Sequence, residues 1–364
     1  MPQENGLDQR EDGLPPEPIC VQYRFSQTAP TGQGIPTQIR LLTVSEKLLA
    51  TVHGDRDVLI WNLTRNAPPR SVEIEAMMDR ITGIAFSPTS DRVLAVSFRL
   101  GASHEVWSYD WGSGTAEAVF ETGGADFHSV QFSPDGRLLA WISGGCVDVW
   151  ETVINTHVVT LRESKRKTNG MPVARFAFTP DSSRIATLDR AGRMTTWDVA
   201  TWDVATWDVA TWSDVKESLC GKTGGASASW DGVGREAMQL VADGRGRVMA
   251  ACRQTDGTSP WTWRLTTWWP ENGSRAELEM NGCAFACVPR NGGFVATVQA
   301  DGGRLRIRDV GNGVCLDQST QGIAKTGKTP LVVAGAIAVG DRVMVTQIAN
   351  GRTTVWQLTA AADE

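Results

Sequence analysis

The segment with the clearest chemical signature is Gly322–Thr329, which reads GIAKTGKT. It satisfies the pattern G-x-x-x-x-G-K-[ST] of a phosphate-binding loop, in which backbone N–H groups and a following helix hold phosphate. Here Pro330 disfavours helical geometry at Thr329, and the residues that follow, LVVA, are strand-like. Only 35 residues follow Thr329, which are too few for the rest of a nucleotide-binding domain. We therefore interpret the segment as a loop and predict no nucleotide cofactor.

The residues that could bind a metal do not form a recognisable set. Cys283 and Cys287 are four positions apart, a spacing that on a strand separates them by about 13 Å, whereas zinc ligands converge within about 2.3 Å of one point. The sequence has no G-x-S-x-G nucleophile elbow and no local Cys–His signature. The four histidines fall in separate parts of the chain: His53, His104, His128 and His157. We predict no catalytic residue, no metal site and no cofactor.

One basic run is a candidate for partner binding. It spans residues 162–170, reads RESKRKTNG and includes Arg162, Lys165, Arg166 and Lys167. A solvated loop is the simpler interpretation, and a nuclear signal or a contact with an acidic partner is the alternative.

A repeated pentapeptide is the second candidate. From Thr196 the chain reads TWDVA TWDVA TWDVA TWSDV, and we interpret about fifteen residues, 197–211, as an expansion in a loop. One interpretation is a neutral duplication, because long loops cost little closure entropy. The other is an adhesive aromatic surface shared with the next equivalent loop. The tryptophans of this second interpretation are Trp202, Trp207, Trp212, Trp268 and Trp269.

Composition narrows the class of protein. The 364 residues include 35 Lys and Arg against 41 Asp and Glu, a net charge of −6, which argues against a nucleic-acid partner. The seven cysteines are odd in number and lack the spacing of a disulfide framework. We therefore expect free thiols in a reducing compartment, the cytoplasm or alternatively the nucleus.

No part of the sequence predicts a membrane segment. The N-terminus lacks the basic and apolar regions of a signal peptide. The longest apolar stretch, residues 331–339, has nine residues, whereas a spanning helix needs about twenty. We expect no membrane partner.

Internal repeats organise the chain. Three segments carry a Phe-Ser/Thr-Pro turn signal, and their phenylalanines are spaced 46 residues apart: Phe86, Phe132 and Phe178. Each opens a run that ends in a strand containing a tryptophan: Trp107, Trp150 and Trp197. Looser copies on both sides bring the count to seven. A period of about 40–50 residues with four short strands per unit is typical of a β-propeller.

The pattern resembles the WD-repeat β-propellers over residues 19–358. The resemblance implies an all-β, seven-bladed β-propeller of four-stranded antiparallel blades, closed by the N-terminal strand at residues 19–25. Residues 1–18 and 359–364 are then expected to be a disordered leader and a disordered tail. No repeat carries the family's Gly-His pair. Of the tryptophans that end the third strands of the repeats, only Trp197 is followed by Asp, and the resemblance implies Thr187 and Asp189 as further members of its hydrogen-bonded set.

This resemblance predicts a noncatalytic scaffold that binds other proteins through its rim loops, as a monomer or as a component of a larger complex. Two alternatives remain open from the sequence. One is a propeller enzyme with a site in the central channel. The other is a degenerate relative of the propellers that are fused to nucleotide-switch proteins.

Overall fold

We describe the fold from a computed structural model of the chain. The described residues are 19–28, 39–45, 47–65, 67–72, 80–100, 103–123, 127–162, 172–189, 194–202, 204–207, 238–242, 247–253, 263–269, 274–287, 294–299, 305–309, 315–318, 336–339, 343–347 and 352–360.

Within these residues the chain forms strands and no helix, and the strands pair into seven four-stranded antiparallel sheets. Sheet one contains β2 (Ile39–Val44), β3 (Leu48–His53), β4 (Asp57–Asn62) and β5 (Arg70–Val72). Sheet two contains β6 (Arg80–Ser87), β7 (Ser90–Leu100), β8 (Ser103–Asp110) and β9 (Thr115–Gly123). Sheet three contains β10 (Phe127–Phe132), β11 (Leu138–Ser143), β12 (Cys146–Glu151) and β13 (Thr156–Leu161).

The later sheets repeat this strand order. Sheet four contains β14 (Val173–Phe178), β15 (Arg184–Asp189), β16 (Met194–Asp198) and β17 (Val204–Trp207). Sheet five contains β18 (Met238–Ala242), β19 (Val248–Arg253), β20 (Trp263–Trp269) and β21 (Ser274–Met280). Sheet six contains β22 (Cys283–Cys287), β23 (Phe294–Gln299), β24 (Leu305–Asp309) and β25 (Cys315–Gln318). Sheet seven contains β26 (Ala336–Val339), β27 (Val343–Gln347), β28 (Arg352–Ala360) and β1 (Ile19–Thr28).

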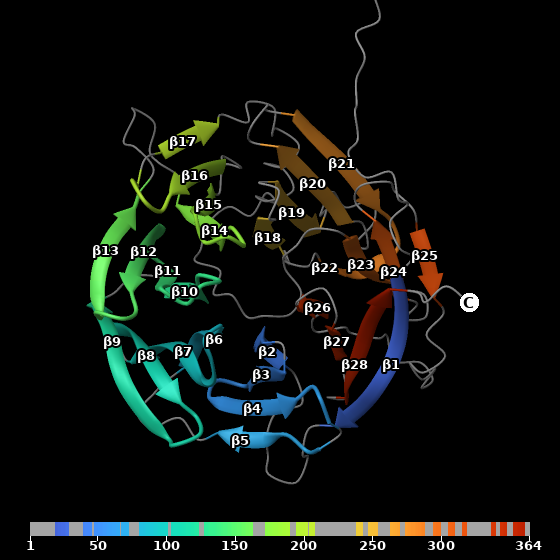
Figure 1. Ribbon diagram of the computed structural model, residues 1–364, viewed down its shortest axis with the longest axis horizontal. Coiled ribbons are helices and arrows are strands. Elements are labelled where there is room, and N and C mark those ends of the chain that lie inside the picture. Colours follow the sequence, from blue (N-terminus) through green and yellow to red (C-terminus); the bar gives the residue numbers. More distant parts are fainter. Residues whose placement is uncertain are drawn as a thin grey trace, which may run out of the picture.

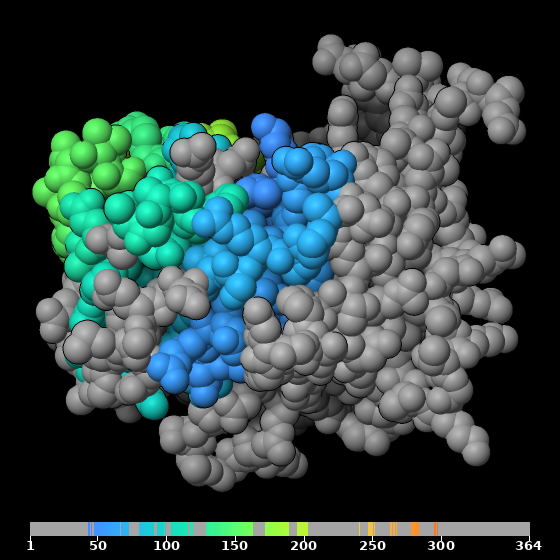
Figure 2. All heavy atoms as spheres, turned by 90° about the horizontal axis from the view of Figure 1, so that it is seen from below, coloured from blue at the N-terminus to red at the C-terminus, as the bar shows by residue number. Residues whose placement is uncertain are grey.

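The sheets lie around a common centre, with the first strand of each nearest to it (Figure 1). The first strands of neighbouring sheets contact one another in several places, including β2 with β6 and β6 with β10. From the side, the described atoms of sheets one, two and three form one continuous surface (Figure 2). The prediction of an all-β chain of four-stranded antiparallel sheets is confirmed for the described residues, and the arrangement is consistent with the blades of a β-propeller.

Sheet seven joins strands from the two ends of the described chain. β1 pairs with β28, from Ile19 opposite Ala360 to Thr28 opposite Arg352, with a bulge after Tyr23. The predicted strand at residues 19–25 is therefore present and continues to Thr28. Residues 359 and 360, which were expected to begin a tail, belong to β28, because the pairing with β1 extends that far. The predicted leader and residues 361–364 lie outside the described residues.

The apolar positions of the repeats form the contacts between sheets. Between sheets three and four, strand residues of both sheets, among them Val149, Phe178 and Ile185, form one buried cluster. The repeat anchors Phe86 and Phe178 are buried at equivalent ends of β6 and β14. Because alternate residues of a strand point to opposite faces, each sheet offers one apolar face to each neighbour. This is why the strands are apolar at nearly every position instead of alternating with polar residues.

A hydrogen bond between the second and third strands recurs in two sheets. In sheet one, Trp61 Nε1 donates to Thr51 Oγ1 over 2.8 Å, and Thr51 Oγ1 also contacts His53 Nε2 at 2.9 Å. In sheet four, Trp197 Nε1 donates to Thr187 Oγ1 over 3.1 Å. The predicted contact between Thr187 and Trp197 is present, while the side chain of Asp189 lies outside what the structure describes.

Sheet three replaces this hydrogen bond with aromatic packing. Trp150 pairs with Leu139 as Trp197 pairs with Ile185, so Trp141 stands where sheet four has Thr187. The Trp141 and Trp150 rings are 6.1 Å apart between centroids, and Trp150 Nε1 donates to Asn155 Oδ1 over 2.8 Å. The residue at this position of the second strand therefore contacts the tryptophan of the third strand in both sheets, through a hydrogen bond in sheet four and through ring packing in sheet three.

No helix in the described part of the chain combines the length and the apolar character that crossing a bilayer requires.

Removing β1 should disrupt sheet seven. Deletion of residues 1–17 leaves β1 whole, so we expect unchanged thermal unfolding and a single peak in size-exclusion chromatography. Deletion of residues 1–28 exposes the edge of β28, and we expect a lower melting temperature and aggregation. Equal behaviour of the two truncations would show that the pairing of β1 with β28 does not stabilise the protein.

The Trp61–Thr51 hydrogen bond should contribute to stability. Thr51→Val keeps the shape of the side chain but removes the acceptor from the buried indole N–H. We expect a loss of about 1–3 kcal/mol in the free energy of unfolding, measured by urea denaturation. Thr51→Ser keeps the hydroxyl and serves as the control, with a smaller loss of about 0.8 kcal/mol from the removed methyl group. Valine and serine variants of equal stability would contradict this role.

Candidate protein-interaction surface

The tryptophans proposed for the rim do not share one type of position. Trp202 lies in the turn between β16 and β17, whereas Trp207 lies in β17 and Trp268 and Trp269 lie in β20. Trp212 lies outside the described residues. The expected placement of Trp207, Trp268 and Trp269 in connecting loops is wrong, because each forms part of an antiparallel ladder.

The pentapeptide expansion is also more than a loop. Residues 204–207 lie within the predicted insertion, and they form the outermost strand of sheet four. Sheet four needs a fourth strand to cover the edge of β16, and the repeated sequence supplies it. The expansion from 197 to 211 therefore includes both the turn and this outer strand.

The other candidate residues from the sequence do not form a site within the described part of the structure. Arg162 is exposed at the end of β13, while Lys165, Arg166, Lys167 and the segment 322–329 lie outside the described residues. Cys283 and Cys287 lie on one strand, β22, as expected. Among the residues that the structure describes, no three His, Cys, Asp or Glu side chains come together as metal ligands.

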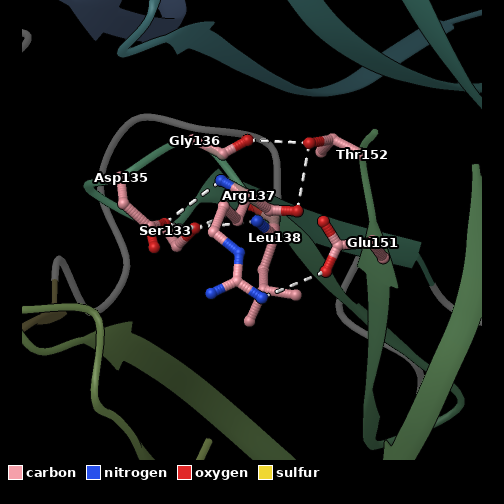
Figure 3. A network of polar contacts seen from close by, with 7 residues as sticks. All are labelled: Ser133, Asp135, Gly136, Arg137, Leu138, Glu151 and Thr152. Carbon is pink, nitrogen blue, oxygen red and sulfur yellow. Dashed lines mark hydrogen bonds and ion pairs between the residues drawn. The ribbon is translucent and has the colours of Figure 1, made fainter. Parts of the chain in front are cut away.

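The turn between β10 and β11 is a rigid polar element (Figure 3). The Ser133 hydroxyl donates to Asp135 Oδ1 over 2.6 Å, and the Arg137 backbone N–H donates to the same oxygen over 3.1 Å. The backbone N–H of Leu138 donates to Ser133 Oγ over 2.8 Å. Gly136 has a φ of +75°, and a Cβ atom there would lie 2.6 Å from the Thr89 side chain of sheet two. Glycine is therefore required where the two turns meet.

This turn also holds the next turn of the same sheet. The Thr152 hydroxyl donates to the backbone oxygens of Gly136, over 2.8 Å, and Arg137, over 3.0 Å. An ion pair of 3.7 Å joins Arg137 to Glu151 across the two turns (Figure 3). The turns at 133–137 and 152–155 therefore form one surface.

Hydrogen bonds carry this surface onto sheet four. The backbone N–H of Asp135 donates to Ser182 Oγ over 3.0 Å. In sheet four, the backbone N–H of Val199 donates to the backbone carbonyl oxygen of Ser183 over 2.8 Å. Four turns are thus linked in a row, and together they make up what we name the turn surface: residues 133–137, 152–155, 179–183 and 198–202.

The aspartates of the turn surface are held in their charged form. Partial burial by itself would raise the pKa of Asp135, but hydrogen bonds from Ser133 and the Arg137 backbone outweigh it and lower the pKa. The same balance lowers the pKa of Asp181, with Thr179 and Ser183 as donors. At the exposed Asp198, the backbone N–H groups of Thr201 and Ala200 lower the pKa. The resulting stabilisation is present above the usual carboxyl pKa and is lost as the pH falls through the lowered values.

The turn surface carries exposed aliphatic side chains. Of the large apolar side chains that the structure describes, three are exposed, and all are in sheet three: Val153 at 80%, Ile154 at 67% and Val158 at 39%. Val153 and Ile154 form the tip of the turn between β12 and β13, and Val158 lies in β13. The sequence analysis missed these residues, although the apolar pair within a turn at residues 152–155 was a signal that could have indicated them.

Trp202 is the aromatic member of the turn surface. It has a φ of +59°, a left-handed conformation that favours glycine or asparagine. The equivalent turns of sheets two and three place Gly114 and Asn155 in this conformation. The indole is half-buried against the apolar cluster between sheets three and four, so packing holds the residue in a strained backbone geometry.

Comparison of the chain with models of known protein families finds no match, and comparison with curated proteins finds none either.

Shortening the pentapeptide array tests the position of the outer strand. Deletion of residues 206–210 leaves the sequence through β17 unchanged, because Thr211 and Trp212 then follow Ala205. We expect the melting temperature to stay within about 2 °C of the wild type. Deletion of residues 203–210 removes β17 and leaves β16 whole, and we expect a loss of about 2 kcal/mol or more, measured by urea denaturation, with exposure of the edge of β16. Tolerance of the longer deletion would show that β17 is dispensable.

Proposed function

We propose that this chain is a noncatalytic scaffold that binds another protein through the turn surface. The observation that carries the proposal is the pair Val153 and Ile154, exposed at 80% and 67% on a turn that hydrogen bonds hold rigid. Removing an apolar side chain from water is favourable, and a core residue obtains this free energy when the protein folds. Two aliphatic side chains at the tip of a fixed turn obtain it only when a partner covers them.

The rigidity of the turns supports a binding role. Ordering a mobile loop on association reduces the affinity, and a surface that is already ordered avoids that cost. The hydrogen bonds of Asp135, Thr152 and Val199 join the four turns of the surface before any partner arrives.

The architecture that we propose is a seven-bladed β-propeller of the WD-repeat type, closed by the N-terminal strand. The pairing of β1 with β28 supports closure, and the hydrogen bonds Trp61–Thr51 and Trp197–Thr187 support the likeness to WD repeats. We propose a cytoplasmic location because seven cysteines without a disulfide framework suit a reducing compartment. We also propose that the chain works without a cofactor.

The test is recovery of the full-length chain from its own cells with bound proteins preserved by mild cross-linking. We expect one or a few proteins in near-equimolar amount, measured by quantitative mass spectrometry against an unrelated tagged protein of similar size. A chain recovered alone, with a metal or small molecule bound in stoichiometric amount and a measurable turnover, would overturn the scaffold proposal in favour of a propeller enzyme.

A further inference from the structure

The turn surface has a definite charge as well as apolar side chains. Among the described residues, its turns and the strand ends that join them carry four carboxylates, those of Asp135, Glu151, Asp181 and Asp198. They carry two guanidinium groups, those of Arg137 and Arg184. Within the described part of the surface, carboxylates therefore outnumber guanidinium groups by two. An aspartate is charged at neutral pH, and hydrogen bonds lower the pKa of each of these three further, so they stay charged in mildly acidic solution as well.

Hydrogen bonds connect the apolar pair and these charges from turn to turn. Val153 and Ile154 lie in the turn that the Thr152 hydroxyl joins to the turn containing Asp135. The hydrogen bond from Asp135 to Ser182 then leads to Asp181, and the bond between Val199 and Ser183 leads to Asp198. The aliphatic pair is thus joined through linked turns to Asp135 in sheet three and to Asp181 and Asp198 in sheet four.

We propose that the turn surface binds a partner segment in which one or two aliphatic residues are followed by basic residues. The aliphatic side chains cover Val153 and Ile154, and the basic side chains lie along Asp135 and Asp181. Charge complementarity selects a basic segment, because a second acidic segment would be repelled and a neutral one would leave the aspartates without new partners. This proposal rests on the proposed function and specifies its partner.

The structure favours recognition by side chains over addition of a strand to β13. β13 is the outer strand of sheet three, and its pairing with β12 shifts register between Val149 and Trp150, opposite Val158. Such a bulge interrupts the regular spacing of the edge that a new strand would need. The exposed turn tips beside β13 have no such restriction.

Binding of designed peptides to the full chain tests the proposal. The probe is a fluorescein-labelled twelve-residue peptide with a Leu-Leu pair followed by three alternating Arg and Lys residues in a Gly-Ser background, and the control peptide has Glu at the basic positions. We expect the basic peptide to bind with a Kd of about 10–100 µM, measured by fluorescence anisotropy, and to bind more weakly in high salt because the charges are screened. The acidic peptide should bind at least about tenfold more weakly.

Three variants separate the parts of the surface. Val153→Ser with Ile154→Ser should weaken binding about tenfold or more, and Asp181→Asn should weaken it while reducing the dependence on salt. Val158→Ser, which alters an exposed valine of the same sheet outside the turn surface, should leave the affinity unchanged. Circular dichroism should match the wild type in all three, because none of these side chains is buried. Thermal unfolding should match the wild type in the two serine variants, while Asp181→Asn should unfold at a slightly lower temperature because the carboxylate accepts hydrogen bonds from Ser183.

The outcomes distinguish this proposal from the proposed function. Equal binding of basic and acidic peptides, or binding that Val153→Ser with Ile154→Ser leaves intact, overturns the choice of partner. Absence of peptide binding, combined with a cross-linked partner that these variants retain, overturns the turn surface as the site but leaves the scaffold. Absence of both peptide binding and a partner overturns both proposals.

Discussion

The structure depends on the requirement that each small sheet bury both of its faces against its neighbours. A sheet of four short strands cannot form a core of its own, so the apolar side chains on its two faces must be covered by the sheets beside it. Buried clusters that join sheet one to sheet two, sheet two to sheet three and sheet three to sheet four meet this requirement. Because both faces of each sheet are buried, the strands are apolar on both faces, and the turns of neighbouring sheets come into contact where the sheets end.

The same packing creates the surface that we propose for binding. When two sheets pack face to face, their turns are brought together at the edge, and polar side chains there can bond across the boundary. Asp135 and Ser182 do so between sheets three and four, and Gly136 and Thr89 come into close contact between sheets two and three. A binding surface built in this way inherits the rigidity of the core, which explains how short turns can hold charged and aliphatic side chains in fixed positions.

Much of the fold could be predicted from the sequence because the same pattern of apolar strands and turns recurs in each repeat. The 46-residue spacing of Phe86, Phe132 and Phe178 placed the first strands of three sheets, and the tryptophans that follow placed the third strands. The site could not be predicted in the same way. Val153 and Ile154 are chemically like the core residues around them, and only their place at the tip of a turn exposes them.

The sequence by itself determined the all-β class and the repeated four-strand unit, because the period of the apolar residues and the turn signals are local properties of the chain. The pentapeptide shows what only tertiary structure decided. Three tryptophans in identical TWDVA units have three environments: Trp197 is buried in β16, Trp202 occupies a left-handed turn, and Trp207 lies in the outer strand. Identical local sequence cannot select among these states. Strand pairing selects them, because the first tryptophan pairs with β15, the second falls in the turn and the third pairs with β16.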